Sequence, residues 1–330
     1  MDNFDTSTMS DYEDTNSTMT YVPPCDMTDI TNFSKHLLPP FYSVIFIISV
    51  LGNGLVLYIL FKFEKPNTVT NIFLINLVAS DLIFTIGLPF QAVYHTSEWS
   101  FGQVGCKLMN GTYHLGFYSS VLFLTLMTFD RYLAVVHAVA AAKWRQSCYA
   151  YISATVVWIV CGLTSLETFL NHDIVQDIVQ GLTCTDMGDP QHKIMGTYSQ
   201  VALFFIFPLV VVLYCYIRIG LRVLSTRMRS KQRPLKLIFI IVVLLFMCWT
   251  PYNVILVIRE NDNGDPCDYS LVYPQYITHS IANLYFGINP VFYTFLGRKF
   301  QNYVHRFLLD QVPCLKNYLD VSESNRSFSR

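Results

Sequence analysis

Charged residues are scarce in this chain, and their scarcity limits the class of protein it can be. Only 14% of the 330 residues are Asp, Glu, Lys or Arg, whereas a soluble domain has about 25%. A soluble surface with so few charges would expose large apolar patches, which promote aggregation. Residues 201–207 and 237–246 carry no charge at all. The pattern excludes most soluble enzymes and predicts a helical protein that crosses a lipid bilayer several times.

Motifs of several other classes are absent as well. The chain has no HExxH, GxSxG or CxxC sequence, and no lysine between Lys236 and Lys299. These absences argue against an intramembrane hydrolase, a zinc site and a light-driven pump that binds its chromophore to a lysine in the last span. The net charge of −1 gives no bulk attraction for nucleic acid. No internal repeat is visible, although a polytopic transporter stays a distant alternative.

Apolar segments predict seven membrane-spanning helices, since about 20 apolar residues are needed to cross a bilayer. They lie near 38–62, 71–95, 105–136, 148–170, 197–222, 235–258 and 271–296. The third and seventh are the most polar, with Asn110 and His114 in one and His279 and Asn283 in the other. Polar groups inside a span usually face a bundle interior or a water-filled cavity. We therefore expect an all-α membrane protein, a seven-transmembrane helix bundle.

The distribution of charge predicts how these helices are oriented. Lysines and arginines gather on one side of the spans, which the positive-inside rule makes cytoplasmic, and the opposite side is acidic. An odd number of spans then places the N-terminus outside the cell, in a multi-pass plasma-membrane protein. The expected parts are an extracellular acidic arm (1–36), the bundle (37–297), an amphipathic eighth helix (298–310) and a cytoplasmic tail (311–330).

Two kinds of residue fit an extracellular side. Asn16 and Asn32 begin glycosylation sequons before the first span, and no cleavable signal peptide is visible. Four cysteines also fall on this side: Cys25, Cys106, Cys184 and Cys267. In an oxidising compartment four cysteines allow three sets of disulfide pairings.

One segment resembles a known family. Residues 130–139 read DRYLAVVHAV, which is similar to the DRYLAIVHAV signature of chemokine receptors, a branch of the rhodopsin-like (class A) G-protein-coupled receptors. Residues 99–107 resemble the WxFGxxxCK stretch of the same branch, and residues 289–293 resemble the NPxxY motif. Other landmarks follow in the family's order: Gly52, Asn53, Asp81, Trp158, Pro208, Tyr216 and residues 248–252. The resemblance covers about residues 21–309.

The chain departs from the family at its expected ligand pocket. A glutamate of the seventh span that often meets ligand amines is replaced by His279, and Gln91 stands where relatives often have tryptophan. Ala140, Ala141 and Ala142 form an unusually plain loop after the DRY residues.

The resemblance implies a receptor that transmits chemokine binding to a heterotrimeric G protein of the inhibitory type. A scavenging chemokine receptor that does not signal is the alternative. We expect no enzyme activity and no cofactor beyond an allosteric sodium ion. The lipid bilayer, arrestin and a basic chemokine are the other expected partners.

The implied site residues fall into groups by role. Ligand binding is assigned to the acidic arm and the cavity: Asp11, Tyr12, Glu13, Asp14, Tyr94, Tyr113, Tyr252 and His279. The activation switch comprises Asp130, Arg131, Tyr132, Tyr216, Trp249, Pro251, Asn289, Pro290 and Tyr293. Asp81 and Ser120 would hold sodium, beside Asn53 and Asn289. The expected disulfides are Cys106–Cys184 and Cys25–Cys267. Cys314 is a candidate for palmitoylation, Tyr12 for sulfation, and Ser322, Ser324, Ser327 and Ser329 for phosphorylation that recruits arrestin.

Overall fold

The structure, a computed structural model, describes residues 28–64, 66–144, 146–177, 181–226, 232–262 and 270–296, together with residues 301 and 303. The long helices are α1 (Thr28–Phe63), α2 (Val69–Ile86), α4 (Gly102–Val136), α6 (Ser147–Asn171), α8 (Phe207–Thr226), α9 (Gln232–Glu260) and α10 (Val272–Leu296). The shorter elements are α3 (Leu88–Tyr94), α5 (Ala138–Trp144), α7 (Pro190–Val201), the π-helical segment η1 (Ala202–Ile206), and strands β1 (His172–Asp177) and β2 (Gly181–Asp186).

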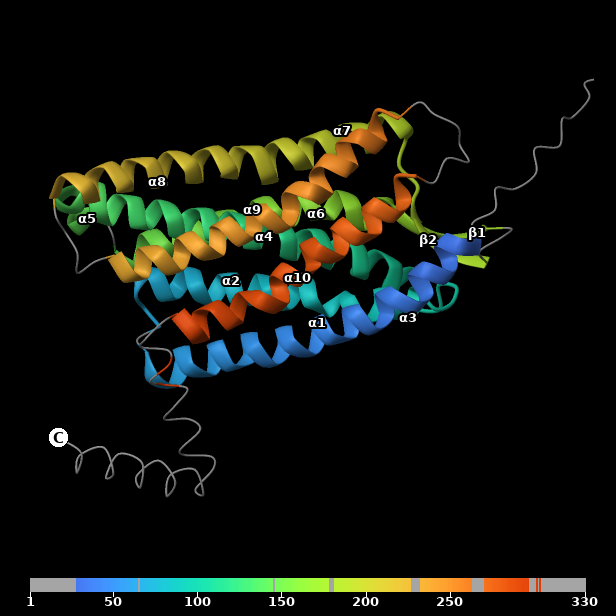
Figure 1. Cartoon of the computed structure of the whole chain (residues 1–330), viewed down its shortest axis with the longest axis horizontal. Coiled ribbons are helices and arrows are strands. Elements are labelled where there is room, and N and C mark those ends of the chain that lie inside the picture. Colours follow the sequence, from blue (N-terminus) through green and yellow to red (C-terminus); the bar gives the residue numbers. More distant parts are fainter. Residues whose placement is uncertain are drawn as a thin grey trace, which may run out of the picture.

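The helices lie side by side as one bundle, with α4 in its interior (Figure 1). Helix α4 packs on α2, α6, α8 and α9, while α1 packs on α2 and α10. The strands lie at one end, here named the hairpin end, and α5 lies at the other, named the α5 end (Figure 1). This arrangement confirms the predicted helical bundle.

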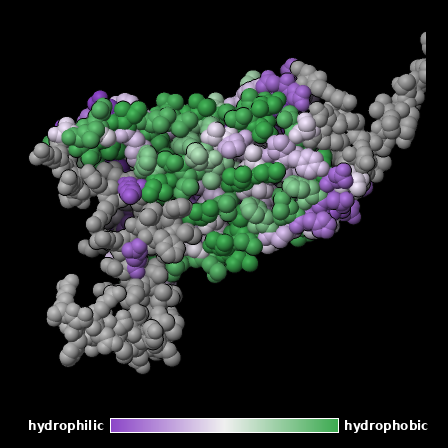
Figure 2. Space-filling model, in the orientation of Figure 1, coloured by the Kyte–Doolittle hydropathy of each residue, from purple (hydrophilic) through white to green (hydrophobic). Residues whose placement is uncertain are grey.

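Polarity in the bundle is distributed as a membrane protein requires. Apolar side chains such as Leu51 and Met247 are 68% and 69% exposed on the outer faces, while Asn53, Asp81 and Asn289 are buried inside. Hydrophobic residues cover the middle of the visible face, and hydrophilic residues gather towards the ends (Figure 2). Lipid chains around the middle of the bundle would keep these apolar side chains out of water, which is favourable.

Among the described residues, six segments are long and apolar enough to cross a bilayer: 28–63, 69–94, 102–136, 147–171, 190–225 and 238–260. Helix α10 is the seventh. Its 25 residues extend about 37 Å at 1.5 Å per residue, which exceeds a hydrocarbon core of about 30 Å. Its polar side chains lower its hydropathy, and several of them, including Ser280, Asn283 and Asn289, are buried within the bundle.

Prolines account for the irregular parts of the spans. The second span divides at Gly87 into α2 and α3, because Pro89 has no backbone N–H to continue the ladder. The fifth span changes to the wider π-helical turn of η1 just before Pro208. Helix α1 continues through Pro39 and Pro40 and begins at Thr28, so the last residues of the expected arm are helical.

The loop after the DRY residues is also helical. The alanines of this segment favour helix, and α5 occupies Ala138–Trp144, where Ala141 N–H donates to His137 O at 2.8 Å. Helix α5 packs against α4.

Candidate functional site

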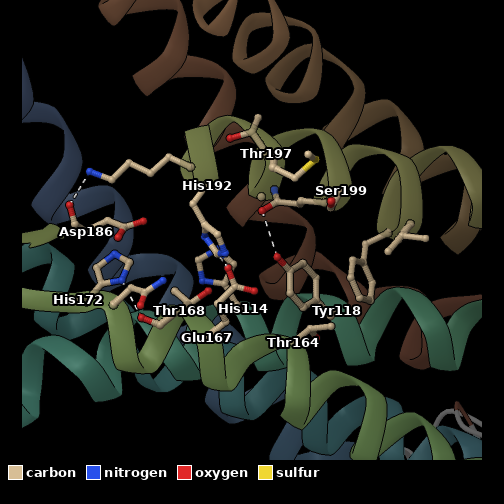
Figure 3. Close-up of a pocket in the computed structure, with 17 residues that line it drawn as sticks. His114, Tyr118, Thr164, Glu167, Thr168, His172, Asp186, His192, Thr197 and Ser199 are labelled. Carbon is tan, nitrogen blue, oxygen red and sulfur yellow. Dashed lines mark hydrogen bonds and ion pairs between the residues drawn. The ribbon is translucent and has the colours of Figure 1, made fainter. Parts of the chain in front are cut away.

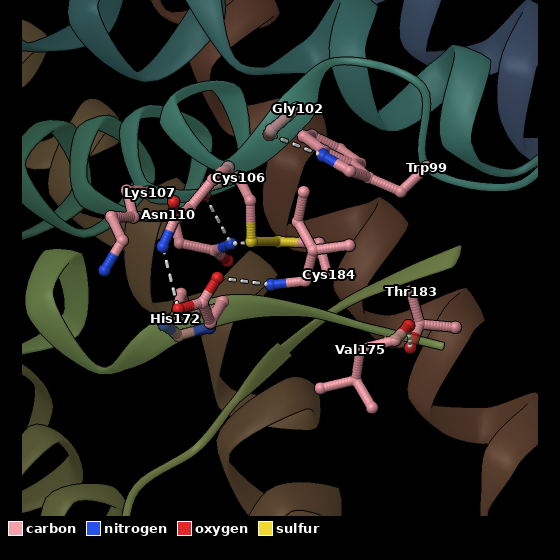
Figure 4. The surroundings of a disulfide bond; sticks show 12 residues. Trp99, Gly102, Cys106, Lys107, Asn110, His172, Val175, Thr183 and Cys184 are labelled. Atoms are coloured by element: carbon pink, nitrogen blue, oxygen red, sulfur yellow. Dashed lines mark hydrogen bonds between the residues drawn. A yellow bond between two sulfur atoms is a disulfide. The ribbon is translucent and has the colours of Figure 1, made fainter. Parts of the chain in front are cut away.

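A disulfide fixes the hairpin end of the site to α4. Cys106 of α4 is bonded to Cys184 of β2, with the two Cα atoms 5.6 Å apart (Figure 4). Strands β1 and β2 pair antiparallel, with Ile174 opposite Cys184. The bond encloses a loop of 78 residues and therefore greatly restricts the unfolded chain.

Trp99 packs beside this disulfide. Its indole Nε1 donates to Gly102 O at 2.9 Å, and its backbone N–H donates to Leu182 O at 2.7 Å. Gly102 has a φ of +68°, which favours glycine and places that carbonyl (Figure 4). Glu98 adds a contact, because its Oε2 accepts from Leu182 N–H at 2.9 Å. The WxFGxxxCK stretch thus holds the hairpin over the helix ends.

Three of the four predicted cavity residues meet at one point. The Tyr113 hydroxyl of α4 lies 2.8 Å from His279 Nε2 of α10, and the Tyr42 hydroxyl of α1 lies 3.4 Å from His279 Nδ1. The ring of Tyr252 on α9 lies 5.1 Å from the imidazole. His279 of α10 therefore meets side chains from three other helices, and these hydroxyls and the imidazole can each donate or accept a hydrogen bond.

Tyr94 lies in a neighbouring cluster instead. It packs edge-on against Trp99 at 5.4 Å, with the disulfide residues close by. His95 lies between the two clusters, 5.8 Å from Tyr42 and 5.7 Å from Tyr276. Burial lowers the pKa of His95 to about 4, so its ring is neutral at physiological pH.

Aromatic ring contacts connect His279 to Trp249. Tyr252 meets Trp249 edge-on at 5.9 Å, and Trp249 stacks on Phe117 of α4 at 3.8 Å. Trp249 is 1% exposed and lies two residues before Pro251, which interrupts the ladder of α9. These rings thus form a continuous set of contacts between His279 and the proline position of α9.

The predicted sodium residues converge in the middle of the bundle. Asp81 is fully buried; its Oδ1 accepts from Ser120 Oγ at 2.8 Å and its Oδ2 from Asn289 Nδ2 at 2.8 Å. Its backbone carbonyl accepts from Thr85 Oγ1 at 2.6 Å. Asn53 joins through a hydroxyl chain, since it donates to Ser49, which lies 2.7 Å from the Thr85 hydroxyl.

These groups fit a hard monovalent cation. The amide oxygens of Asn53 and Asn289 are buried, and neither has a hydrogen-bond partner among the described residues. With the Asp81 carboxylate and the Ser120 hydroxyl they form an all-oxygen set, which hard cations prefer. The described part of the chain contains no group of three His, Cys, Asp or Glu residues that could hold a metal.

Arg131 is held at the α5 end. Its Nη2 lies 3.7 Å from Asp130 Oδ2 and donates to Thr70 Oγ1 of α2. Asp130 is nearly fully buried, and Arg131 is only 17% exposed. The guanidinium thus links α4 to α2 instead of extending into solvent.

The other switch residues of this end lie beside α8. Tyr132 packs with Val135, Cys215 and Ile219, and Tyr216 lies edge-on to Phe239 of α9 at 5.0 Å. Pro290 lies close to α1, because a Cβ on Gly52 would come 2.8 Å from the Pro290 Cβ. The side chain of Tyr293 lies outside the part of α10 whose side chains the structure describes.

Several predicted residues lie outside the described residues. They are Asp11, Tyr12, Glu13, Asp14, Asn16, Cys25, Cys267, Cys314, the tail serines and most of the expected eighth helix. Asn32 is described; it is exposed on the first turns of α1. Sequence reasoning missed Tyr42 and His95, which complete the His279 cluster. The only signal for Tyr42 was its hydroxyl inside a largely apolar span.

Seven helices pack around an apolar core that encloses a few buried polar side chains. A tethered hairpin lies at one end and a held arginine at the other, and together these features define a seven-helix membrane receptor. Residues 52–293 match the family described as "7 transmembrane receptor (rhodopsin family)". The chain is 34% identical to C-C chemokine receptor type 3 of Cavia porcellus over 98% of this chain and 91% of that protein. It is 32% identical to C-C chemokine receptor type 8 of Homo sapiens (90% and 85%) and 34% identical to type 4 of Homo sapiens (85% and 80%).

The chain therefore belongs to the chemokine-receptor branch of the rhodopsin-like G-protein-coupled receptors. Members of this family are membrane-spanning receptors and not enzymes, in agreement with the missing catalytic motifs.

Proposed function

We propose that this protein is a plasma-membrane receptor that binds a chemokine at its hairpin end and activates a heterotrimeric G protein of the inhibitory type at its α5 end. The hairpin end then faces the cell exterior, together with the N-terminus. The relatives' printed names supply the ligand class. The observation that carries the signalling step is the pair formed by Arg131 with Asp130 and Thr70, at the opposite end of the bundle from His279.

Binding would proceed in two stages. A basic chemokine is first attracted by the acidic arm that contains Asp11, Glu13 and Asp14, since opposite charge speeds encounter. Its flexible end then enters between the helices and replaces contacts of His279 with Tyr113 and Tyr42.

Activation would be a shift between two states of the bundle. A ligand that contacts the active state better shifts the population towards it. Displacement of Trp249 by the rings above it bends α9 at Pro251, and the opening of the α5 end frees Arg131 for the G protein. Sodium at Asp81, Ser120, Asn53 and Asn289 would stabilise the resting state, because the cation satisfies the two unpaired amide oxygens.

The test is nucleotide exchange on an inhibitory-type G protein in membranes that contain the receptor, stimulated by a panel of chemokines. Arg131→Ala should retain chemokine binding and lose stimulated exchange. Thr70→Val keeps the side-chain volume nearly constant but removes the hydroxyl that accepts from Arg131. This variant should therefore show more nucleotide exchange in the absence of ligand. Normal stimulated exchange in Arg131→Ala would refute the role of Arg131. Binding without exchange in the native protein would show a scavenging receptor instead.

A further inference from the structure

The outer edge of β2 is covered by α3 and by the segment that links α3 to α4. Glu98 Oε2 accepts from the Leu182 N–H at 2.9 Å, and the Trp99 N–H donates to the Leu182 carbonyl oxygen at 2.7 Å. The Tyr94 hydroxyl hydrogen-bonds the backbone of Cys184, two residues further along β2. The backbone groups of Leu182 and Cys184 therefore point away from β1, and they already have partners.

Strand β1 has the matching pattern on its own outer side. Gln176 lies opposite Leu182, and Ile174 lies opposite Cys184. Where two opposite residues of an antiparallel pair do not bond to each other, the backbone groups of both point outward. The N–H and carbonyl groups of Ile174 and Gln176 thus form the outer edge of β1, here named the β1 edge. Asp173 Oδ1 accepts from the Ile174 N–H at 2.8 Å, and the other three groups have no partner among the described residues.

The β1 edge is both ordered and accessible. Asp173 Oδ2 accepts from Gln103 Nε2 of α4 at 2.9 Å, and the disulfide of Cys184 holds the strand opposite Ile174 (Figure 4). Gln176 is exposed. An exposed strand edge is a template on which an extended segment can add as a further strand. Because β1 is already fixed, such an addition orders little of the receptor itself.

The β1 edge lies outside the pocket between α6 and α7. The first pair of the hairpin, His172 and Asp186, belongs to the lining of that pocket, and Lys193 of α7 donates to the Asp186 carbonyl oxygen at 2.6 Å (Figure 3). Ile174 and Gln176 are not part of the lining. A strand added to β1 would therefore contact the backbone of the hairpin and not the space between the helices.

The charge of the hairpin determines which segment fits. Residues 172–186 contain three aspartates and neither lysine nor arginine. Asp173, Val175 and Asp177 project from the same face of β1, since side chains alternate along a strand. Side chains directly opposite each other on antiparallel strands interact, and like charges there are destabilising. The best partner strand has basic residues four positions apart with an apolar residue midway, whereas the acidic arm of this chain or a second copy of β1 would be repelled.

We propose that the β1 edge binds an extended basic segment of the receptor's protein ligand as an additional antiparallel strand. Gln176 exchanges both of its backbone hydrogen bonds with the segment, the Ile174 carbonyl oxygen accepts a third, and the aspartates of β1 face its basic residues. The identity of the ligand as a basic protein rests on the proposed function. The new element is recognition of the ligand's backbone by the hairpin, separate from the acidic arm and from the His279 cluster.

The first experiment uses the purified full-length receptor in lipid nanodiscs and the acetylated peptide TKTVTKT, with a fluorescent dye at its carboxyl end. Its lysines are four positions apart, with valine midway. One control peptide has an N-methyl group on the third residue, whose N–H would face Gln176, and the other has it on the valine, whose N–H would face away. Fluorescence anisotropy should show at least about tenfold weaker binding of the first control than of the second, because only the first loses a hydrogen bond to β1.

Two receptor variants at one position separate the backbone from the side chain. Gln176→Pro removes the outward N–H and leaves the bonds between β1 and β2 intact, because Gln176 and Leu182 do not bond to each other. Gln176→Ala keeps the N–H. The proline variant should bind the unmodified peptide at least about tenfold more weakly, and the alanine variant should change binding less than about twofold. An equal unfolding midpoint and equal hydrogen exchange of residues 181–186 in the two variants check that the hairpin is intact.

The second experiment measures binding of the chemokine panel to the same variants. Any chemokine that binds the native receptor should bind at least about tenfold more weakly to Gln176→Pro and nearly equally to Gln176→Ala. If no chemokine binds but the peptide binds and is sensitive to Gln176→Pro, the proposed function is refuted and strand addition at the β1 edge is supported. Equal binding of the two control peptides, no binding of the unmodified peptide, or unchanged chemokine binding in Gln176→Pro would overturn the proposal.

Discussion

Replacing Gly116 with alanine should destabilise the bundle more than its single added methyl group suggests. Gly116 lies where α4 crosses α2, and an added Cβ would come 2.5 Å from Phe84 N, 2.6 Å from its Cβ and 2.7 Å from its Cα. Two of these three atoms are backbone, so a change of side-chain rotamer cannot relieve the overlap. The two helices must separate by about 1 Å to restore a normal contact.

Overpacking of this kind costs about 1–3 kcal/mol. The matched control is Gly162→Ala on α6, where an added Cβ meets nothing within 4 Å. Alanine at an open helical position stabilises by about 0.4–1 kcal/mol. The two alanine variants should therefore differ by about 1.4–4 kcal/mol, which corresponds to a difference of several degrees in unfolding midpoint.

The assay is thermal unfolding of the purified receptor with a thiol-reactive fluorescent dye, which reports exposure of the buried thiols Cys161 and Cys215. Phe84 also stacks on Phe286 at 3.7 Å and touches Tyr113, so Gly116→Ala should weaken the response to ligand as well. If Gly116→Ala unfolds at the same temperature as Gly162→Ala, the close crossing of α2 and α4 is wrong.

Three further predictions concern the ends and the centre of the bundle. Removing the tether with Cys106→Ser and Cys184→Ser together should cost about 2–5 kcal/mol and raise hydrogen exchange in residues 172–186, while Cys148→Ser, an exposed free thiol, should do neither. Sodium chloride, compared with choline chloride, should raise the unfolding midpoint of the native receptor but not that of Asp81→Asn; a sodium effect that persists in the variant would contradict the proposed site. The pKa of His95 is about 6.5 in the unfolded chain and about 4 in the folded protein. The free energy of unfolding should therefore fall as the pH drops between these values, because only the unfolded chain gains the proton. His95→Gln should lack this pH-dependent loss of stability.

Much of the bundle could be predicted because the signal is local. A continuous apolar run of about 20 residues indicates a span regardless of what surrounds it. The seventh span was the hardest to predict, because its buried asparagines weaken the apolar signal. These asparagines contact Asp81 and His279 inside the bundle. The convergence of Asp81 with Ser120 and Asn289 came from family resemblance, and the structure brings these side chains together.

The remaining features depend on contacts between distant segments. Tyr42 and His279 are 237 residues apart, and nothing near either position in the sequence predicts that they meet. The β1–β2 hairpin is short and partly polar, so its strands resemble loop residues until the Cys184 bond and Trp99 fix them. The division at Gly87 depends on Pro89, but a proline alone does not determine whether a helix bends or breaks.

The π-helical segment η1 has a consequence for how the fifth span can be changed. Each residue of an α-helix advances by about 100°, so a segment with one extra residue per turn rotates everything before it relative to everything after it. Gln200 precedes η1 and contacts Tyr118, while Cys215 follows η1 and packs with Tyr132. Both of these tyrosines belong to α4. Deleting a single residue from Ala202–Ile206 would convert the wide turn to ordinary α-helix and turn the two halves by about a quarter of a revolution. Only one half could then keep its partner on α4.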